Sequence, residues 1–331
     1  MIVLCGVSFS SNNCITIFVV YNNNDENVYN ENMQTIHVGV NEDIKTINDA
    51  ISAILGPATI ILEDKVYREK VVVDKPNIVI DGQNKAKVVY NDYATKIHAD
   101  GREYVTFRTY TMIVKAPHVT LKNLTIENDA GEGYIVGQAV ALHLYADDIH
   151  VENCHIKAKQ DTLFLGPLSP DLIERYVTLL PDDERFYSGE FHHYLDNCVI
   201  EGTVDFIFGG ASATFTNCKI VCLPIKKSGT ACSWIAAPNH ELNNRHGFIF
   251  DHCKILKGEG TSDDSYYLGR PWRDNGYLIF KDCYLDSHIK KDGFSIWEGT
   301  NRHLGARFYE EGSYGPGASK DRIEWAHVKS L

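Results

Sequence analysis

An imperfect repeat constrains the fold more than any other feature of this sequence. Short runs of β-branched residues follow one another along most of the chain, and five of them carry Asn, Asp or His followed by Cys. The step of 20 residues between two of these cysteines corresponds to about one turn of a solenoid, and the longer steps imply insertions at loops. The cysteines of the repeat are Cys154, Cys198, Cys218, Cys253 and Cys283.

One such repeat is too small to bury its own apolar face, so neighbouring repeats must stack. Short strands separated by turns, with few helical stretches, favour an all-β coil of parallel strands over βαβ units. The repeated cysteines are then predicted to form a buried ladder, because free cysteine is among the most buried residue types. Redox or metal chemistry is the less favoured alternative, since the nine cysteines include no CxxC pair that would indicate zinc.

Residues 41–55 contain the clearest helical pattern. A helix there would cover the open end of the coil, where exposed strand edges invite aggregation. The residues that support this helix are Ile44, Ile47, Ile51 and Ile54 or Leu55 at helical spacing, with Asn41 or Asp43 as its N-cap.

The first 32 residues differ from the rest of the chain. A mildly apolar stretch without a basic start precedes residues 22–32, which are mostly Asn, Asp and Glu. We therefore expect residues 1–32 to be an extension and Met33 to be the true start, which would make the protein cytoplasmic. If residues 1–32 act as a signal, the protein is secreted. Residues 33–331 show no linker and are predicted to form one domain.

The charge balance argues against nucleic acid as a partner. The sequence has 44 acidic and 32 basic residues, a net charge of −12, whereas phosphate binding depends on clustered Lys and Arg. No stretch approaches the ~20 apolar residues that cross a bilayer. A monomer without metal or cofactor is the expected state.

Four segments carry residues suited to chemistry: residues 137–142, 160–164, 202–211 and 266–272. Asp205 lies between Val204 and Phe206, and a carboxylate buried among apolar residues needs a partner. The planar guanidinium of Arg270 is suited to hold it ionised, and a held carboxylate can act as a nucleophile.

The remaining candidates complement this pair. Asp161, placed near a second carboxylate, is expected to have a raised pKa and to act as a general acid. Gln138 and Gln160 offer neutral donors to an oxyanion, and Trp272 offers a flat face to a sugar ring. Each of the four segments alone could equally be a turn, a strand or a packed tryptophan. Their combination favours a catalytic site.

Together, the four segments resemble the signature blocks of the pectin methylesterases. The residues from Thr106, Asn123, Ser233 and Tyr314 onward also resemble blocks of that family, so the similarity covers about residues 33–331. It implies a right-handed parallel β-helix that removes methyl esters from pectin or from oligogalacturonides and releases methanol. Asp205 would be the nucleophile, Asp161 the general acid and base, and Gln160 and Gln138 the oxyanion donors. Arg270 would orient Asp205, with Trp272, Thr106, Gln138 and Arg270 as substrate contacts.

Two departures from the family pattern stand out. The first block, Gly-x-Tyr-x-Glu in the family, here keeps Tyr67 and Glu69 but has Lys65 in place of the glycine. The spacing of 44 residues between Asp161 and Asp205 is about twice that of plant members and resembles bacterial ones. The added segment, Gly166–His193, is predicted to line the groove.

Two rival functions fit a β-helix. A pectate lyase would need clustered acids for calcium and a basic residue, and a polygalacturonase would need carboxylates spaced for glycosidic cleavage. Neither explains two glutamines beside the aspartates. A non-catalytic polysaccharide-binding β-helix is the rival from another class.

Overall fold

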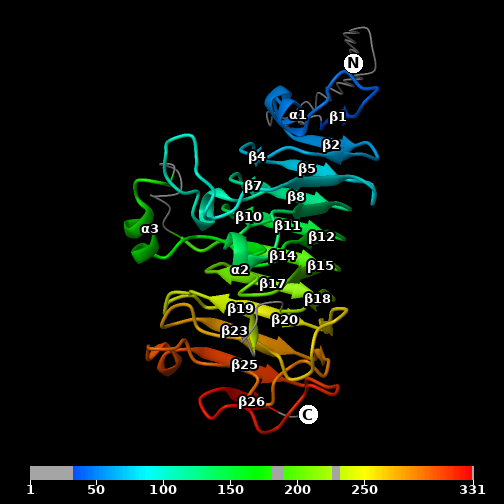
Figure 1. The fold of residues 1–331 in the computed structure, drawn as a ribbon. Coiled ribbons are helices and arrows are strands. Elements are labelled where there is room, and N and C mark those ends of the chain that lie inside the picture. Colours follow the sequence, from blue (N-terminus) through cyan, green and yellow to red (C-terminus); the bar gives the residue numbers. More distant parts are fainter. Residues whose placement is uncertain (1–32, 181–188, 226–231, 330–331) are drawn as a thin grey trace, which may run out of the picture.

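The chain winds into a parallel β-helix in the computed structural model, which describes residues 33–180, 189–225 and 232–329. The described residues form 26 strands in three sheets that run along the length of the molecule (Figure 1). Every strand pair is parallel. The predicted extension, residues 1–32, lies outside the described residues.

Each turn of the coil contributes one strand to each of two or three sheets. In spatial order, the largest sheet contains β1 (Gln34–Val38), β2 (Ala58–Leu62), β5 (Ile78–Asp81), β8 (Val119–Lys122), β11 (Ile149–Glu152), β14 (His192–Asp196), β17 (Ser212–Thr216), β20 (Phe248–Asp251), β23 (Tyr277–Lys281), β25 (Arg307–Glu311) and β26 (His327–Lys329). The second contains β22 (Tyr266–Gly269), β19 (Ser233–Pro238), β16 (Ile207–Gly209), β13 (Leu163–Leu165), β10 (Leu142–Leu144), β7 (Met112–Val114) and β4 (Val71–Val73). The third contains β24 (Tyr284–Leu285), β21 (Lys254–Lys257), β18 (Lys219–Cys222), β15 (Val199–Gly202), β12 (His155–Lys157), β9 (Thr125–Asn128), β6 (Lys87–Tyr90) and β3 (Val66–Tyr67).

Equivalent side chains stack along the interior of the coil. Phe215, Phe250 and Phe280 are paired in register, and their rings stack with centroids 4.4 and 4.6 Å apart. The predicted cysteine ladder is confirmed, because all five repeat cysteines are buried and free. Each thiol donates to a carbonyl one rung away, as Cys218 does to Leu195 at 3.4 Å.

The residue before each cysteine forms a corner between two sheets. Asn153, Asn197, Asn217, His252 and Asp282 all have φ between 51° and 54°. Asn, Asp and His are the side chains most often found in this left-handed region. The Asn197 amide donates to Asn153 Oδ1 at 2.6 Å, so these two corners are also bonded to each other. The repeated dipeptide is therefore a turn signal followed by a core residue.

A helix at the N-terminal end was predicted and is present, but it is shorter than expected. Helix α1 spans Ile47–Ala53, and Thr46 is its N-cap, accepting from the Asp49 amide at 3.1 Å. The predicted caps, Asn41 and Asp43, are wrong because Ile44 bridges Val38 in the first rung and keeps the chain extended there. Of the expected apolar face, Ile47, Ile51 and Ile54 are buried and Leu55 is exposed.

The other helices are short and lie outside the coil. They are α2 (Gly133–Val136), α3 (Pro170–Tyr176) and the 3₁₀ helices η1 (Thr106–Arg108) and η2 (Arg302–Leu304). Helix α3 projects sideways from the solenoid, within the segment that separates the two aspartates (Figure 1). None of the described helices has the length and apolarity needed to span a membrane.

Candidate active site

Asp161 and Asp205 lie side by side on adjacent turns of the coil. Gln160 bridges Val204 in parallel register, so the 43 intervening residues return the chain to the neighbouring rung, about 4.8 Å away. Both aspartates have positive φ, 61° and 44°. Their amides donate to the carbonyls of Val204 (3.1 Å) and Trp234 (2.9 Å). The corner conformation, tolerated by Asp, thus aims two carboxyl groups out of the same edge.

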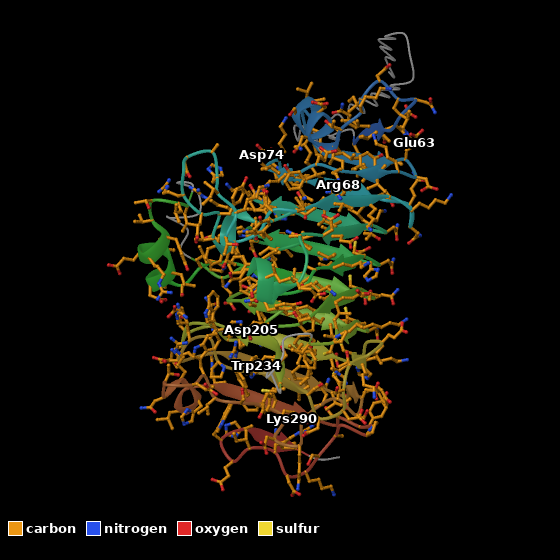
Figure 2. The ribbon with its side chains drawn as sticks, in the orientation of Figure 1. Glu63, Arg68, Asp74, Asp205, Trp234 and Lys290 are labelled. Atoms are coloured by element: carbon orange, nitrogen blue, oxygen red, sulfur yellow. The ribbon has the colours of Figure 1, made fainter. Side chains whose placement is uncertain are left out.

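Arg270 holds Asp205 in a bidentate ion pair. Its Nε lies 2.9 Å from Oδ1 and its Nη2 lies 2.5 Å from Oδ2. The guanidinium carbon is 3.6 Å from the ring centroid of Trp234 and 4.2 Å from that of Trp297. Figure 2 shows Asp205 and Trp234 near each other in the lower half of the coil. Aromatic faces and a carboxylate therefore fix the guanidinium together.

Burial controls the protonation of both carboxyl groups. Burial, followed by the charge of Asp205, raises the pKa of Asp161 well above its usual value, although Arg270 and a hydrogen bond from Gln160 oppose this. Burial also raises the pKa of Asp205, against the ion pair and hydrogen bonds of Arg270. Arg270 bonds directly to Asp205 and stabilises its charged form. When the two neighbouring aspartates hold one proton between them, that proton therefore belongs on Asp161.

All seven site residues predicted from the sequence line one cleft of about 280 Å³. They come from several turns of the coil, and their roles stay predictions. The cleft lining combines them with mostly apolar residues: Thr106, Phe107, Gln138, Gln160, Asp161, Leu172, Arg175, Tyr176, Val204, Asp205, Phe208, Ala237, Arg270, Trp272 and Trp297.

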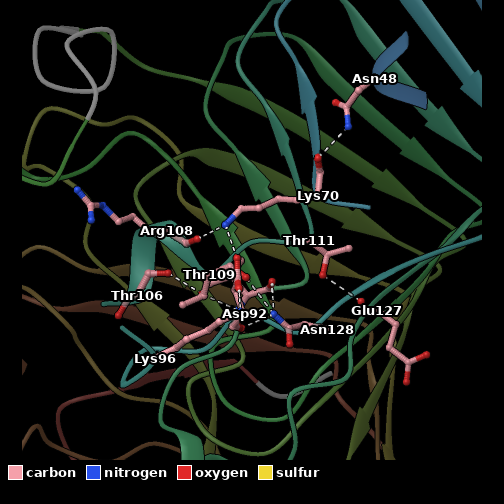
Figure 3. Close-up of polar contacts among 11 residues, drawn as sticks. Asn48, Lys70, Asp92, Lys96, Thr106, Arg108, Thr109, Thr111, Glu127 and Asn128 are labelled. Carbon is pink, nitrogen blue, oxygen red and sulfur yellow. Dashed lines mark hydrogen bonds and ion pairs between the residues drawn. The ribbon is translucent and has the colours of Figure 1, made fainter. Parts of the chain in front are cut away.

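A buried ionic network positions the part of the cleft that contains Thr106 and Phe107 (Figure 3). Asp92 is 1 % exposed and accepts from Lys70 (2.8 Å) and Lys96 (2.6 Å). Lys70 also donates to the carbonyl of Arg108, at the end of η1. The cleft wall is thereby tied to a carboxylate that needs both lysines as partners.

The turn into η1 is strained. Val105 has φ 50°, which is a true outlier for a β-branched residue. Its amide donates to Ala94 at 3.0 Å, and Thr109 Oγ1 donates to the Thr106 carbonyl at 2.7 Å. Strain of this kind persists only where the surroundings determine it, and it is common at binding sites.

Helix α3 forms another wall and is held at both ends. Arg273 donates to both oxygens of Asp171 at 2.6 to 3.0 Å. Beyond the other end of the helix, Arg108 Nε donates to the Leu179 carbonyl at 3.0 Å. The prediction that the segment 166–193 lines the groove is confirmed for three residues of α3: Leu172, Arg175 and Tyr176. Residues 181–188 of this segment lie outside the described residues.

Comparison with known proteins places the chain in a family. A sequence model of the family described as Pectinesterase matches residues 35–167 and 180–331. The chain belongs to the pectinesterase family. Helix α3 falls in the interval between the two matched segments.

Relatives named pectinesterase occur in plants. Pectinesterase 31 of Arabidopsis thaliana is 32 % identical over 305 residues, which cover 86 % of this chain and 83 % of that protein. The pectinesterase of Petunia integrifolia is 30 % identical over 297 residues, covering 85 % and 70 %. The chain spans 47 % of a longer relative, probable pectinesterase/pectinesterase inhibitor 23 of Arabidopsis thaliana, at 31 % identity over 306 residues.

Solved pectin methylesterases have the same fold. A crystal structure of a pectin methylesterase in complex with a hexasaccharide matches with a TM-score of 0.73 and 24 % identity, covering 89 % of this chain and 92 % of that one. The enzyme from Erwinia chrysanthemi matches with a TM-score of 0.72 and 24 % identity, covering 90 % and 93 %. The predicted right-handed parallel β-helix is confirmed.

Sequence reasoning missed two tryptophans that contact Arg270 beside this cleft. Trp234 and Trp297 flank Arg270, and Trp234 Nε1 donates to Ser295 Oγ at 2.6 Å. Trp234 lies one rung from Asp205, in the segment from Ser233 that resembles a block of the family. The sequence therefore offered a reason to consider Trp234 as a site residue. Trp297 lies after the last repeat, and no periodicity identifies it.

A possible metal-ligand group lies elsewhere. Within the described ranges, Asp251, His252 and Asp282 place potential ligand atoms within 4.8 Å of one another. They are exposed or half-buried at the corners between sheets, and His252 Nδ1 is 2.8 Å from Asp251 Oδ1. None of them lines the cleft. The expected absence of a metal and a cofactor stays a prediction.

Proposed function

We propose that this chain is a pectin methylesterase, which hydrolyses the methyl esters of polygalacturonate to carboxylates and methanol. The observation that carries the proposal is the Asp205–Arg270 pair, placed beside a second buried carboxyl group in one cleft with Trp272. Membership of the pectinesterase family supports it.

In the first half of the reaction, a carboxylate oxygen of Asp205 attacks the ester carbonyl carbon. The tetrahedral oxyanion accepts hydrogen bonds from the Gln160 and Gln138 amides. As the bond between that carbon and the methoxy oxygen breaks, Asp161 donates its proton and methanol leaves. A mixed anhydride links Asp205 to the galacturonate.

In the second half, Asp161 is a carboxylate and acts as the base. It takes a proton from water while the water oxygen attacks the galacturonate carbonyl of the anhydride. Cleavage of the anhydride returns Asp205 as a carboxylate and releases the free galacturonate, and Asp161 is protonated again. The sum is one ester and one water converted to one acid and one methanol. Trp272 and Thr106 contact the sugar.

A polysaccharide-binding β-helix without activity is the alternative, and product analysis separates all the candidates. An esterase releases methanol, a lyase leaves unsaturated ends and a glycosidase creates new reducing ends. A binding protein produces none of these.

The test is methanol release from highly methylated pectin by the wild type and by Asp205→Asn. We expect methanol from the wild type and a loss on the order of 10⁶-fold in the variant, as for other deleted nucleophiles. Unchanged circular dichroism would show that the variant is folded. Substantial methanol from folded Asp205→Asn would refute the nucleophile assignment, and none from wild type on pectin or on methylated trigalacturonate would refute the activity.

Two finer assignments belong with this proposal. The 44-residue spacing and the α3 segment support a bacterial-type member. A cytoplasmic location, with Met33 as the start, stays a prediction; N-terminal sequencing of protein from its native host tests it, and a mature chain beginning before Met33 would contradict it.

A further inference from the structure

A single buried hydroxyl joins two of the segments that line the cleft. Thr109 follows η1 and is fully buried, and its Oγ1 donates to the carbonyl of Thr106 at 2.7 Å (Figure 3). The same Oγ1 accepts from the amide of Val140 at 3.0 Å. Val140 lies two residues after Gln138, and both Thr106 and Gln138 line the cleft. Thr109 is not one of the described residues that line the cleft, so it can affect the reaction only through its neighbours.

The segment before Gln138 does little to hold this residue in place. Helix α2 ends at Gly137, whose φ of 78° is a conformation that favours glycine. No residue of the described helix α2 is buried, so the helix contributes little packing. The position of Gln138 therefore depends on a bond from the Ala94 amide to its carbonyl, at 2.9 Å, and on the residues that follow it.

The three backbone amides after Gln138 each donate to a neighbouring turn. Those on either side of Val140 donate to backbone carbonyls, at 3.1 and 2.8 Å. The amide of Val140 instead uses a side-chain acceptor, the Thr109 hydroxyl. Because a buried amide without an acceptor is unfavourable, removal of this hydroxyl would disturb the segment that carries Gln138.

The side chain of Asn128 holds the same two places from another turn. Asn128 ends β9 and is 4 % exposed, and its amide donates to the carbonyls of Thr109 at 3.0 Å and Val140 at 3.1 Å. A further bond reaches the Asp92 carbonyl at 2.9 Å, and Figure 3 shows Asn128 beside Thr109 and Asp92. Thr109 and Val140 are thus bonded to each other and to one amide, which fixes the two cleft segments relative to each other.

On the basis of the proposed function, we propose that Thr109 is a positioning residue whose hydroxyl sets the place of Gln138 for donation to the oxyanion. Donors of this kind act by being aligned in advance with the charge that develops. A misplacement of about 1 Å can reduce the rate about 10²-fold. The bond to Thr106 extends the same control to the wall opposite Gln138.

Replacement of Thr109 tests the proposal through the split between kcat and KM. Thr109→Val removes the hydroxyl and keeps the shape of the side chain. The kcat on methylated hexagalacturonate should fall about ten- to a hundredfold, with little change in KM, because the oxyanion forms only after attack. Thr109→Ser keeps the hydroxyl and should retain most of the wild-type kcat. A rise in KM with unchanged kcat would overturn the proposal, because it would place Thr109 in substrate binding through Thr106.

Thr111 offers a matched control two residues further along the chain. It is also fully buried, and its Oγ1 donates to the Glu127 carbonyl at 3.0 Å. Thr111→Val should cost similar stability in urea unfolding while kcat stays close to that of the wild type. Equal kcat in folded Thr109→Val and Thr111→Val would overturn the proposal. If Thr109→Val does not fold, Thr109→Ala removes the same hydroxyl without placing a methyl group against two backbone groups.

Combination with Gln138→Ala shows whether Thr109 acts through Gln138. Once the amide of Gln138 is absent, nothing remains for Thr109 to position. Adding Thr109→Val should then lower kcat by no more than about threefold, so the two changes are not additive. A full additional loss of kcat would contradict the assignment to Gln138.

Hydrogen exchange separates this inference from the proposed function. Exchange of the Val140 amide, followed by NMR, should speed up about tenfold or more in Thr109→Val and return towards the wild-type rate in Thr109→Ser. Unchanged exchange contradicts the inference and leaves the esterase intact. No methanol from the wild type contradicts the esterase, while exchange at Val140 still decides whether the hydroxyl fixes this segment.

Discussion

Two buried arginine–carboxylate pairs in this protein have the same bidentate chemistry and different surroundings. Arg322 donates to Glu310 through Nε at 2.8 Å and Nη2 at 2.9 Å, much as Arg270 donates to Asp205. The side chains of Arg322 and Glu310 are 1 % and 4 % exposed, whereas those of Arg270 and Asp205 are 16 % and 13 % exposed.

The two pairs also differ in the other hydrogen bonds of the arginine and in the backbone conformation at the carboxylate. Arg322 also donates to three backbone carbonyls, those of Lys290, Lys291 and Gly317, and Glu310 lies in regular strand β25. Asp205 instead has φ 44° at a cleft edge. A pair satisfied by backbone stabilises the fold, whereas a pair at a strained corner beside another acid is available for chemistry at a cost in stability.

The largest expected effect is in the cleft. Asp161→Asn should lower kcat by 10²–10⁴-fold, because a neutral amide cannot donate the proton to methoxide. It should also stabilise the fold at pH 8. The raised pKa of Asp161 means that the folded state retains a proton that the unfolded state has lost, so folding stability falls as pH rises from about 3.9 through the raised value.

Methanol release and urea unfolding at pH 4 and pH 8 check both statements. The unfolding free energy of Asp161→Asn should exceed that of the wild type by more at pH 8 than at pH 4. A variant destabilised at pH 8 would mean that Asp161, like Glu310, supports the fold.

The C-terminal pair should show the opposite behaviour. Arg322→Met leaves Glu310 buried without its partner and should cost about 3–5 kcal/mol of stability, while the folded fraction keeps its kcat. Urea unfolding measures the loss, and Glu310→Leu combined with Arg322→Met should recover most of it. A large fall in kcat for the folded variant would remove the distinction between the two pairs.

The Gln160 and Gln138 amides are proposed to donate to a transition state, whereas Arg322 donates to groups of the folded protein. Gln160→Ala should reduce kcat by 10²–10³-fold with little change in KM, because the oxyanion exists only after attack. Steady-state kinetics on methylated hexagalacturonate provide the measurement, with Gln138→Ala for comparison. A rise in KM alone would place Gln160 in ground-state binding.

The smallest expected effect is on the pH dependence of stability, and it comes from His143, a buried polar residue outside both ion pairs. His143 is fully buried among the rings of Phe107, Tyr110, Tyr145 and Phe164, and burial lowers its pKa to about 3. The unfolded state takes up a proton near pH 6.5 and the folded state does not. As pH falls from 6.5 to 5, this one group should therefore lower the free energy of unfolding by about 2 kcal/mol.

His143→Phe should flatten this dependence, measured by urea unfolding at pH 7 and pH 5. The matched variant His246→Phe changes an exposed imidazole and should leave the slope close to that of the wild type. An equal slope in His143→Phe and wild type would show that other groups dominate acid sensitivity.

Much of the architecture follows from local sequence. The corner-and-cysteine dipeptides report where each rung turns, because few residue types accept positive φ and a buried small side chain must follow. Asp161 and Asp205 occupy equivalent corners for the same reason, because Asp also accepts a positive φ. Helix α1 was misjudged at its start because Ile44 fits the helical spacing but bonds to the first rung instead.

Other features had no local signal. The Arg322–Glu310 pair joins strand β25 to a loop after it, and neither residue occupies a repeated position. The α3 wall depends on distant contacts, such as that between Arg273 and Asp171, which sequence spacing does not reveal. Contacts between residues far apart in the sequence can be identified only from the folded structure.

The bridge between Gln160 and Val204 has an evolutionary consequence. The distance between the two aspartates is set by stacking of adjacent turns, and it does not depend on how many residues lie between them. The intervening excursion can lengthen, shorten or be exchanged by recombination while the reacting groups keep their places. Selection can thus retune which pectins are recognised through the wall of the cleft without re-evolving its chemistry.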